Sequence, residues 1–196
     1  MYGASRKHRL LFLAILGLVP ITGVVVMYWQ TWDRRESNFH GVQVYGNPQF
    51  IKQVEVSLRL IEEKSPAAFK LIQRYAPRIE QSRRSGMRAY DDPPTFDLSQ
   101  KTACYSDTWC AGSIAHDTYH SKLYHEYLDG HTGPVPDEAW SGKAKELECI
   151  HYQANVLREI GAPPSETTYA DHLDGSHFDL NGDGKQTWID YWLRDW

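Results

Sequence analysis

An uncharged run of about twenty residues, from Leu10 to Trp29, constrains the chain more than any other feature. A helix of about twenty apolar residues matches the ~30 Å hydrocarbon core of a bilayer. A cleaved signal peptide would have a shorter apolar region, ~7–15 residues, followed by small residues at the cleavage site. Here the run ends in the bulky sequence VMYWQTW. We therefore predict an uncleaved transmembrane helix.

The basic residues that flank this segment predict its orientation. Arg6, Lys7 and Arg9 precede the run, and two arginines follow it. Because cytoplasmic flanks carry the excess of Lys and Arg, we expect a single-pass protein of the cell membrane with residues 30–196 on the extracytoplasmic side. The formal net charge of −4 indicates no basic surface, so we expect no nucleic-acid partner.

Composition and periodicity divide the chain into five segments. We expect a cytoplasmic tail, a membrane anchor, a polar stalk, a main domain, and a calcium loop with a docking helix, at residues 1–9, 10–29, 30–47, 48–164 and 165–196. Helical spacing of apolar residues dominates the main domain, and short alternating pieces near 87–90 and 95–98 predict a small antiparallel sheet. The predicted fold class is α+β, mainly helical, preceded by one transmembrane helix.

The cysteines are interpreted through the predicted compartment. Cys104 and Cys110 are close in sequence, and an extracytoplasmic location favours a disulfide between them. Cys149 is then left as a small buried apolar residue. The alternative is a closed structural zinc site made by the two nearby cysteines with His116 and His120, although its spacing is unlike that of common zinc fingers.

The sequence HDTYH, residues 116–120, places two histidines four residues apart. On a helix, positions i and i+4 lie on one face, so His116 and His120 can direct two imidazoles at one ion. Catalytic zinc sites take three protein ligands and leave a fourth position for water. Asp117 directly follows the first histidine, where a carboxylate can act as general base. Core histidines without a metal are the other interpretation of the pair.

A third ligand is expected on the helix that follows residue 143. Glu146 shares a mainly apolar face with Ile150 and Leu157, whereas Glu148 aligns with Asn155 on the polar face. Burial of a carboxylate without a partner is costly, so a Glu on the inner face is better explained by a metal or a cation. We therefore favour Glu146 as the third ligand and keep Glu148 in reserve.

The sequence His116-Asp117-Thr-Tyr-His120, followed by Glu146-x-x-Cys149 on a second helix, resembles the gluzincin class of zinc metallopeptidases. The resemblance implies a zincin-like body over residues 48–164, zinc bound by His116, His120 and Glu146, and Asp117 as general base. It also implies an oxyanion-binding His or Tyr on a later loop, and a sheet edge that aligns an extended substrate.

The chain departs from the gluzincin pattern at two positions. Asp117 stands where the family has Glu, which shortens the base by one C–C bond, ~1.5 Å. General-base catalysis typically contributes ~10²–10⁴-fold, so slow turnover or none is expected. Ile150 stands where many such enzymes carry an Asp that orients a ligand histidine.

The sequence DLNGDGKQTWID, residues 179–190, predicts a calcium loop that resembles those of EF-hands and dockerins. Its shorter final acid predicts weak affinity, in the ~10⁻⁴–10⁻³ M range of extracellular modules. Tryptophans at four-residue steps after the loop predict a buried stripe on a docking helix. The expected ligands stand at loop positions 1, 3, 5, 7, 9 and 12: Asp179, Asn181, Asp183, Lys185 through its carbonyl, Thr187 and Asp190.

Together these features predict a membrane-anchored, extracytoplasmic zinc metallopeptidase-like protein of low or no activity, with zinc and calcium as cofactors and a peptide or protein substrate. The alternative is a non-catalytic calcium-binding surface protein on a zincin-like scaffold. A polar, Asx-rich turn without calcium remains the simpler interpretation of the C-terminal loop.

Overall fold

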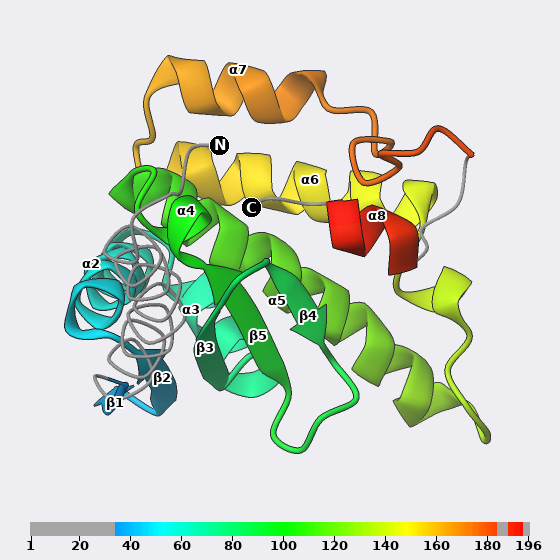
Figure 1. Ribbon diagram of the computed structural model, residues 1–196, viewed down its shortest axis with the longest axis horizontal. Helices are drawn as coiled ribbons and strands as arrows, with labels where there is room; N and C mark the ends of the chain where they lie inside the picture. The colour runs from blue at the N-terminus through cyan, green and yellow to red at the C-terminus, as the bar shows by residue number, and fades with distance from the viewer. Residues whose placement is uncertain (1–33, 184–187, 194–196) are drawn as a thin grey trace, which may run out of the picture. The chain divides into compact units, whose positions relative to one another are not determined.

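The computed structural model describes residues 34–183 and 188–193, and Arg35–Trp196 form one compact unit. The predicted cytoplasmic tail and membrane anchor, residues 1–29, lie outside the described residues. In the part of the chain that is described, no helix is long and apolar enough to cross a bilayer. The fold is mixed α/β and mainly helical (Figure 1).

The strands form one five-stranded mixed sheet in the order β1-β2-β3-β5-β4. The pairs β1–β2 and β4–β5 are antiparallel, whereas β2–β3 and β3–β5 are parallel. The prediction of an antiparallel sheet is therefore correct for β4–β5 and wrong for the centre of the sheet. The strands are β1 (Arg35–Phe39), β2 (Val42–Gly46), β3 (Arg78–Ser82), β4 (Gly86–Arg88) and β5 (Thr95–Ser99).

The predicted stalk is wrong over residues 35–46, which form the β1–β2 hairpin. Val42 and Val44 are fully buried and alternate with partly exposed residues, which is the period of a strand with one face on the core. In the register of the sheet, Val44 lies beside Ile79, and Ile79 lies beside Phe96. This buried row joins β2, β3 and β5 to the apolar core.

Helices α2 (Pro48–Lys64) and α3 (Pro66–Tyr75) connect β2 to β3. The Asn47 side chain accepts a hydrogen bond from the Phe50 backbone N–H, which caps the start of α2. The helical spacing of apolar residues expected for the main domain is confirmed in α2, where Val54, Leu58 and Ile61 are fully buried. Both helices begin at a proline, where the missing N–H is tolerated.

The central element of the unit is the long helix α5 (Asp107–Gly130), which contacts α2, α3, α4, α6, β4 and β5. It is preceded by the short helix α4 (Gln100–Ala103) and followed by η1 (Asp137–Ala139), α6 (Lys143–Glu159), α7 (Pro164–His172) and α8 (Trp188–Leu193). Figure 1 shows α6 running alongside α5, with α7 next to α6 on its other side.

The packing of α5 against α6 is close because Gly112 faces Leu157. A Cβ at position 112 would lie 2.8 Å from Leu157 Cδ2 and 3.1 Å from its Cγ, so the buried Leu157 side chain would have to shift to admit it. Glu166 of α7 is buried and accepts hydrogen bonds from the Ser106 and Thr108 hydroxyls, each at 2.6 Å, at the start of α5. These contacts tie α5 to α6 and to α7.

The predicted disulfide between Cys104 and Cys110 is absent, because both residues and Cys149 are free cysteines. Cys104 is exposed at the end of α4, whereas Cys110 is buried in the first turns of α5. Burial raises the pKa of the Cys110 thiol to about 12, despite a hydrogen bond with Ser57. Cys110 is therefore an unreactive core residue.

Candidate metal centre

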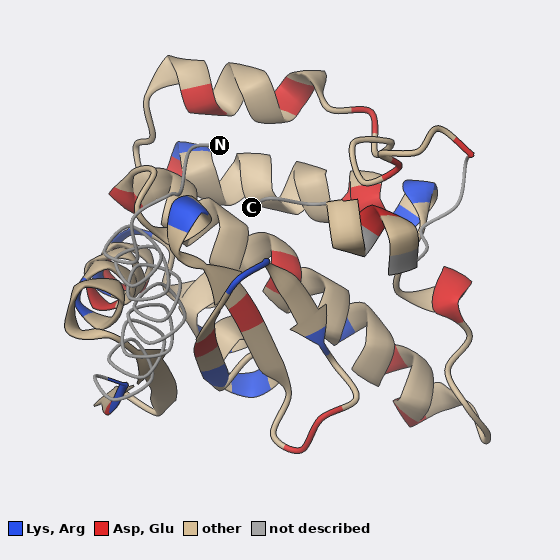
Figure 2. Cartoon of the chain, in the orientation of Figure 1, with Lys and Arg blue, Asp and Glu red and all other residues tan. Residues whose placement is uncertain are grey.

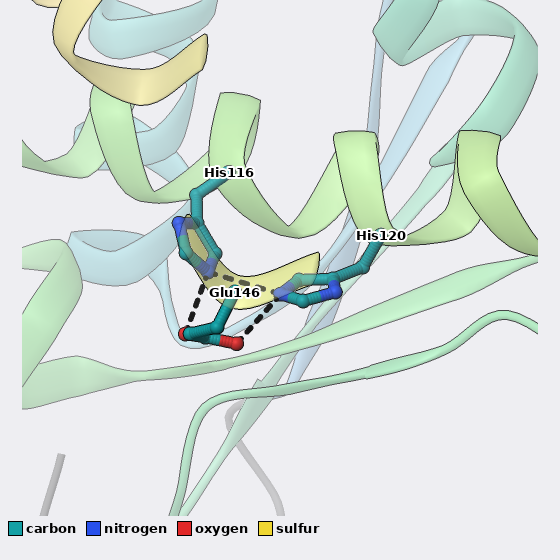
Figure 3. A group of neighbouring side chains, drawn as sticks. All are labelled: His116, His120 and Glu146. Atoms are coloured by element: carbon teal, nitrogen blue, oxygen red, sulfur yellow. Dashed lines mark hydrogen bonds and ion pairs between the residues drawn. The ribbon is translucent and has the colours of Figure 1, made fainter. Parts of the chain in front are cut away.

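Three buried side chains converge where α5 passes the first turn of α6 (Figure 3). His116 and His120 lie one helical turn apart on α5, and Glu146 belongs to the first turn of α6. Their exposed fractions are 9%, 7% and 5%. Glu148 points elsewhere, since it is exposed and pairs with Lys145 at 2.7 Å. The structure therefore brings together the three residues favoured as ligands and leaves the reserve residue outside.

The distances within this cluster match those between the ligands of a small ion. His116 Nε2 lies 3.1 Å from Glu146 Oε1, His120 Nε2 lies 3.0 Å from Glu146 Oε2, and the two Nε2 atoms are 3.1 Å apart. A tetrahedral ion with ~2.0 Å ligand distances holds its donor atoms ~3.3 Å apart. The cluster could hold a metal ion after movements of a few tenths of an ångström.

The hydrogen bond at Nδ1 of His120 determines that Nε2 is the ring nitrogen available to a metal. His120 Nδ1 lies 2.7 Å from the Trp140 carbonyl oxygen, and a carbonyl can only accept, so Nδ1 carries the proton of the neutral ring. The Nε2 lone pair then faces the cluster. A ligand histidine commonly donates its other N–H to a backbone carbonyl in this way. His116 Nδ1 is buried and has no hydrogen-bond partner among the described residues.

The electrostatics of the cluster are those of a buried charged group. Burial raises the pKa of the Glu146 carboxyl, but His116 and His120 outweigh burial and hold this pKa well below its usual range. Burial lowers the pKa of His120, but Cys149 and Glu146 outweigh it and raise the pKa well above 6.5. Without a metal, a proton on His120 therefore compensates the Glu146 carboxylate, and a cation can take its place.

A cavity of about 1040 Å³ opens onto the cluster and is lined by Asp117 as well as by the three converging residues. Along α5, Trp109 and Ser113 continue the same lining face. Tyr105, Trp109 and Tyr169 form an aromatic wall of the cavity, with ring centroids 6.1 and 5.5 Å apart. Tyr105 and Tyr169 are 71% and 56% exposed, so they are available to a ligand.

Another part of the cavity wall is the strand β4, which is an edge strand of the sheet. Its Arg88 lines the cavity, and its guanidinium donates to both Asp97 oxygens at 3.0 Å and to Glu80 at 3.2 Å. Figure 2 shows acidic residues on β3, on β5 and in the loop between β4 and β5, and Arg88 also pairs with Asp91 of this loop. The positive charge of Arg88 is therefore balanced within the protein.

His177, on the segment between α7 and α8, is a member of the site that sequence analysis missed. Its Nε2 lies 3.1 Å from Glu146 Oε1, and its side chain lines the cavity. No periodicity marks this residue, because it lies in a turn outside any helix or strand. Two signals pointed to it only in general terms: a histidine stands just before the predicted calcium loop, and the gluzincin resemblance implies a His or Tyr on a later loop.

The alternative zinc site built from Cys104, Cys110, His116 and His120 is not formed. Within the described residues, the group of converging ligand atoms consists of the two histidines and Glu146 alone. Cys104 is exposed, and Cys110 belongs to the apolar core.

The predicted calcium loop is described in part, since Lys185 and Thr187 lie outside the described residues. Asp190 is fully buried, and its Oδ1 accepts hydrogen bonds from the backbone N–H groups of Leu180 at 3.0 Å and Asn181 at 3.2 Å. The described acids of the loop do not form a converging group. Calcium binding stays a prediction.

The predicted buried tryptophan stripe of the docking helix is wrong at Trp192, which is 64% exposed. Trp196 lies outside the described residues. The backbone of α8 is nevertheless attached to the body, because Arg84 donates a hydrogen bond to the Trp192 carbonyl at 2.5 Å.

Comparison with known proteins gave no match to a family, to a curated protein or to a solved structure.

Proposed function

We propose that this chain is a zinc-dependent hydrolase of the gluzincin type that cleaves a peptide or protein substrate slowly. The observation that carries the proposal is the convergence of His116, His120 and Glu146, with donor atoms 3.0–3.1 Å apart, on the wall of a large cavity. Two imidazoles and one carboxylate are a known ligand set of catalytic zinc. A zinc ion held there would polarise a carbonyl and lower the pKa of a bound water.

Asp117 is proposed as the general base. It follows His116 on α5 and lines the same cavity, so it faces the space in which a water and a substrate carbonyl would meet. Its side chain is ~1.5 Å shorter than that of Glu. Since a well-placed base contributes ~10²–10⁴-fold, the shorter reach accounts for the slow turnover that we propose.

The cavity supports an extended peptide as substrate. Strand β4 borders it and has a strand neighbour only on the β5 side among the described strands, so a peptide could pair with its other edge. The aromatic wall begins at Trp109, seven residues before His116, a rise of ~10 Å along the helix. An extended chain covers this distance in about three residues. We therefore propose a large apolar or aromatic side chain about three residues from the cleaved bond.

The expected location and calcium loop are part of the same proposal. An anchor at Leu10–Trp29 would place the compact unit outside the membrane. The two hydrogen bonds that Asp190 accepts hold the end of the 179–190 segment against its beginning, which supports a calcium loop. In the alternative function, calcium binding without zinc would be the whole activity, and the site on α5 and α6 would be scaffold.

Metal analysis of the purified full-length chain after dialysis against zinc tests the proposal. We expect about one zinc per chain in the parent and in Glu148→Ala, the matched control, and none in His116→Ala or Glu146→Ala. A parent protein that retains no zinc would refute the proposed function and favour the alternative.

Hydrolysis is tested separately with a library of quenched peptides. Asp117→Asn should abolish the zinc-dependent cleavage, and Asp117→Glu should increase it by at least ~10-fold, because the longer acid restores the usual reach of the base. Cleavage that survives Asp117→Asn would exclude Asp117 as the base.

A further inference from the structure

His177 reaches the candidate metal centre from a different part of the chain than the three converging residues. Its Nε2 lies 3.1 Å from Glu146 Oε1, and a carboxylate oxygen can only accept, so His177 donates this hydrogen bond. Its Nδ1 is buried and has no hydrogen-bond partner among the described residues. The contact with Glu146 is therefore the polar interaction that the structure gives this ring.

The position of His177 is outside the ligand shell. The ligand atoms of His116, His120 and Glu146 all lie within 4.8 Å of one another, and His177 does not belong to that group. In a tetrahedral site all donor atoms would be only ~3.3 Å apart. His177 is thus placed beside the carboxylate, on the Oε1 side, while Oε2 faces His120.

Among the described residues, the Glu146 carboxylate has three polar partners, namely the rings of His116, His120 and His177. When His116 and His120 turn their Nε2 lone pairs to a metal, their bonds to the carboxylate are lost. His177 then remains to orient Glu146. Outer hydrogen bonds of this kind orient the ligands of metal sites, and their loss typically weakens metal binding ~10–100-fold.

We propose that His177 is a positioning residue that holds the Glu146 carboxylate in the orientation that binds the metal. The inference rests on the proposed metal centre, and it assigns to the segment after α7 a part in metal binding that the ligand set alone does not give it.

The segment that carries His177 is fastened to the start of α6, the same turn that carries Glu146. A Cβ at Gly175 would lie 2.4 Å from the Lys143 carbonyl oxygen and 3.1 Å from the Leu147 N, so the two backbones are in direct contact there. Phe178, on the other side of His177, is buried with 2% exposure. His177 is therefore held between two anchored neighbours, as a positioning role requires.

Zinc dissociation constants of the full-length protein, measured by competition with a chromophoric chelator, test this role. His177→Ala should weaken zinc binding ~10–100-fold. His177→Gln should recover most of the affinity, because its side-chain amide can donate to the same oxygen. His172→Ala removes an exposed histidine of α7 and is the matched control, for which we expect no change. Circular dichroism of each variant establishes that it is folded.

The visible absorption of the cobalt-substituted protein distinguishes positioning from direct ligation. His177→Ala should keep an intense d–d band of a low-coordinate site with altered band positions, since the ligand count is unchanged. A zinc affinity within twofold of the parent in His177→Ala would overturn the inference. A cobalt spectrum of His177→Ala that shows the loss of one nitrogen ligand would also overturn it, because His177 would then be a ligand. Reduced cleavage at unchanged zinc affinity would overturn it as well, because His177 would then be a substrate contact.

These outcomes separate the inference from the proposed function. If Glu146→Ala loses zinc but His177→Ala does not, only the positioning role fails. If the parent protein binds no zinc, the metal centre and the positioning role fail together.

Discussion

Replacement of Gly175 by Ala tests how strongly the backbone contact between the 173–178 segment and α6 controls the metal centre. The new Cβ would lie 2.4 Å from the Lys143 carbonyl oxygen, whereas carbon–oxygen contacts need ~3.3 Å. The backbone fixes the position of the Cβ, and the Lys143 oxygen is itself a backbone atom, so a rotamer change cannot relieve the overlap, and the segment must move by about 0.9 Å. The bond between His177 and Glu146, now 3.1 Å, would lengthen to about 4 Å, which is no longer a hydrogen bond.

Gly175→Ala should lower both the stability of the fold and the affinity for zinc. An alanine at the positive φ of +79° of Gly175 costs ~1–2 kcal/mol, and the overlap adds ~1–3 kcal/mol to the loss of folding free energy. Zinc binding should weaken ~10–100-fold, the range expected when an outer hydrogen bond to a ligand is lost, which is ~1.4–2.7 kcal/mol.

Gly161→Ala is the matched control for this substitution. Gly161 has a φ of +75°, close to that of Gly175, but a Cβ there would have no neighbour within 4 Å. Both variants carry the same backbone strain, so the difference between them isolates the contact with α6. The assays are thermal unfolding of the metal-free protein and zinc competition. Equal zinc affinities for the two variants would refute the reasoning.

Three further predictions address pH, helix packing and calcium. The metal-free protein should be most stable between pH 4.5 and 6.5. The lowered pKa of Glu146 contributes stability that is lost on acidification through that pKa, and the raised pKa of His120 contributes stability that is lost as the pH rises through it. With chelator present, Glu146→Gln should therefore flatten the dependence of the melting temperature on pH between pH 6 and 9. Gly112→Ala should lower both stability and zinc affinity because its Cβ meets Leu157 at 2.8 Å, whereas Gly130→Ala, with no neighbour within 4 Å, should not lower either in the same assays. Millimolar calcium should raise the melting temperature of the parent and leave that of Asp183→Ala unchanged; no shift in the parent would contradict the calcium loop.

Sequence reasoning found the ligand cluster because its signals are local. Four-residue spacing on a helix fixes the relative direction of His116 and His120, and the cost of burying an unpaired carboxylate separates Glu146 from Glu148. Both arguments need only one helix at a time. The contact between α5 and α6 does not follow from the periodicity of either helix, because it depends on the close approach of Gly112 to Leu157.

Features that depend on distant contacts were missed. The parallel pairing of β2 with β3 and of β3 with β5 joins strands separated by helices or loops, and strands of five residues carry a weak alternation signal. The pairing of β1 with β2 is local, but these strands were mistaken for a stalk because five residues carry a weak alternation signal. Proximity in sequence suggested the disulfide, but the boundary between α4 and α5 sends Cys104 to the surface and Cys110 to the core.

The arrangement of the cluster on α5 and α6 also bears on how the protein would acquire its metal during folding. These are consecutive α-helices of the chain, joined by the loop 131–142, so the ligands can meet by closing one short connection. Such local closures are fast and cost little chain entropy compared with the assembly of the sheet. A nascent α5–α6 hairpin would therefore be able to capture an ion early, and the bound ion would then act as a crosslink that guides the docking of the segments translated before and after it.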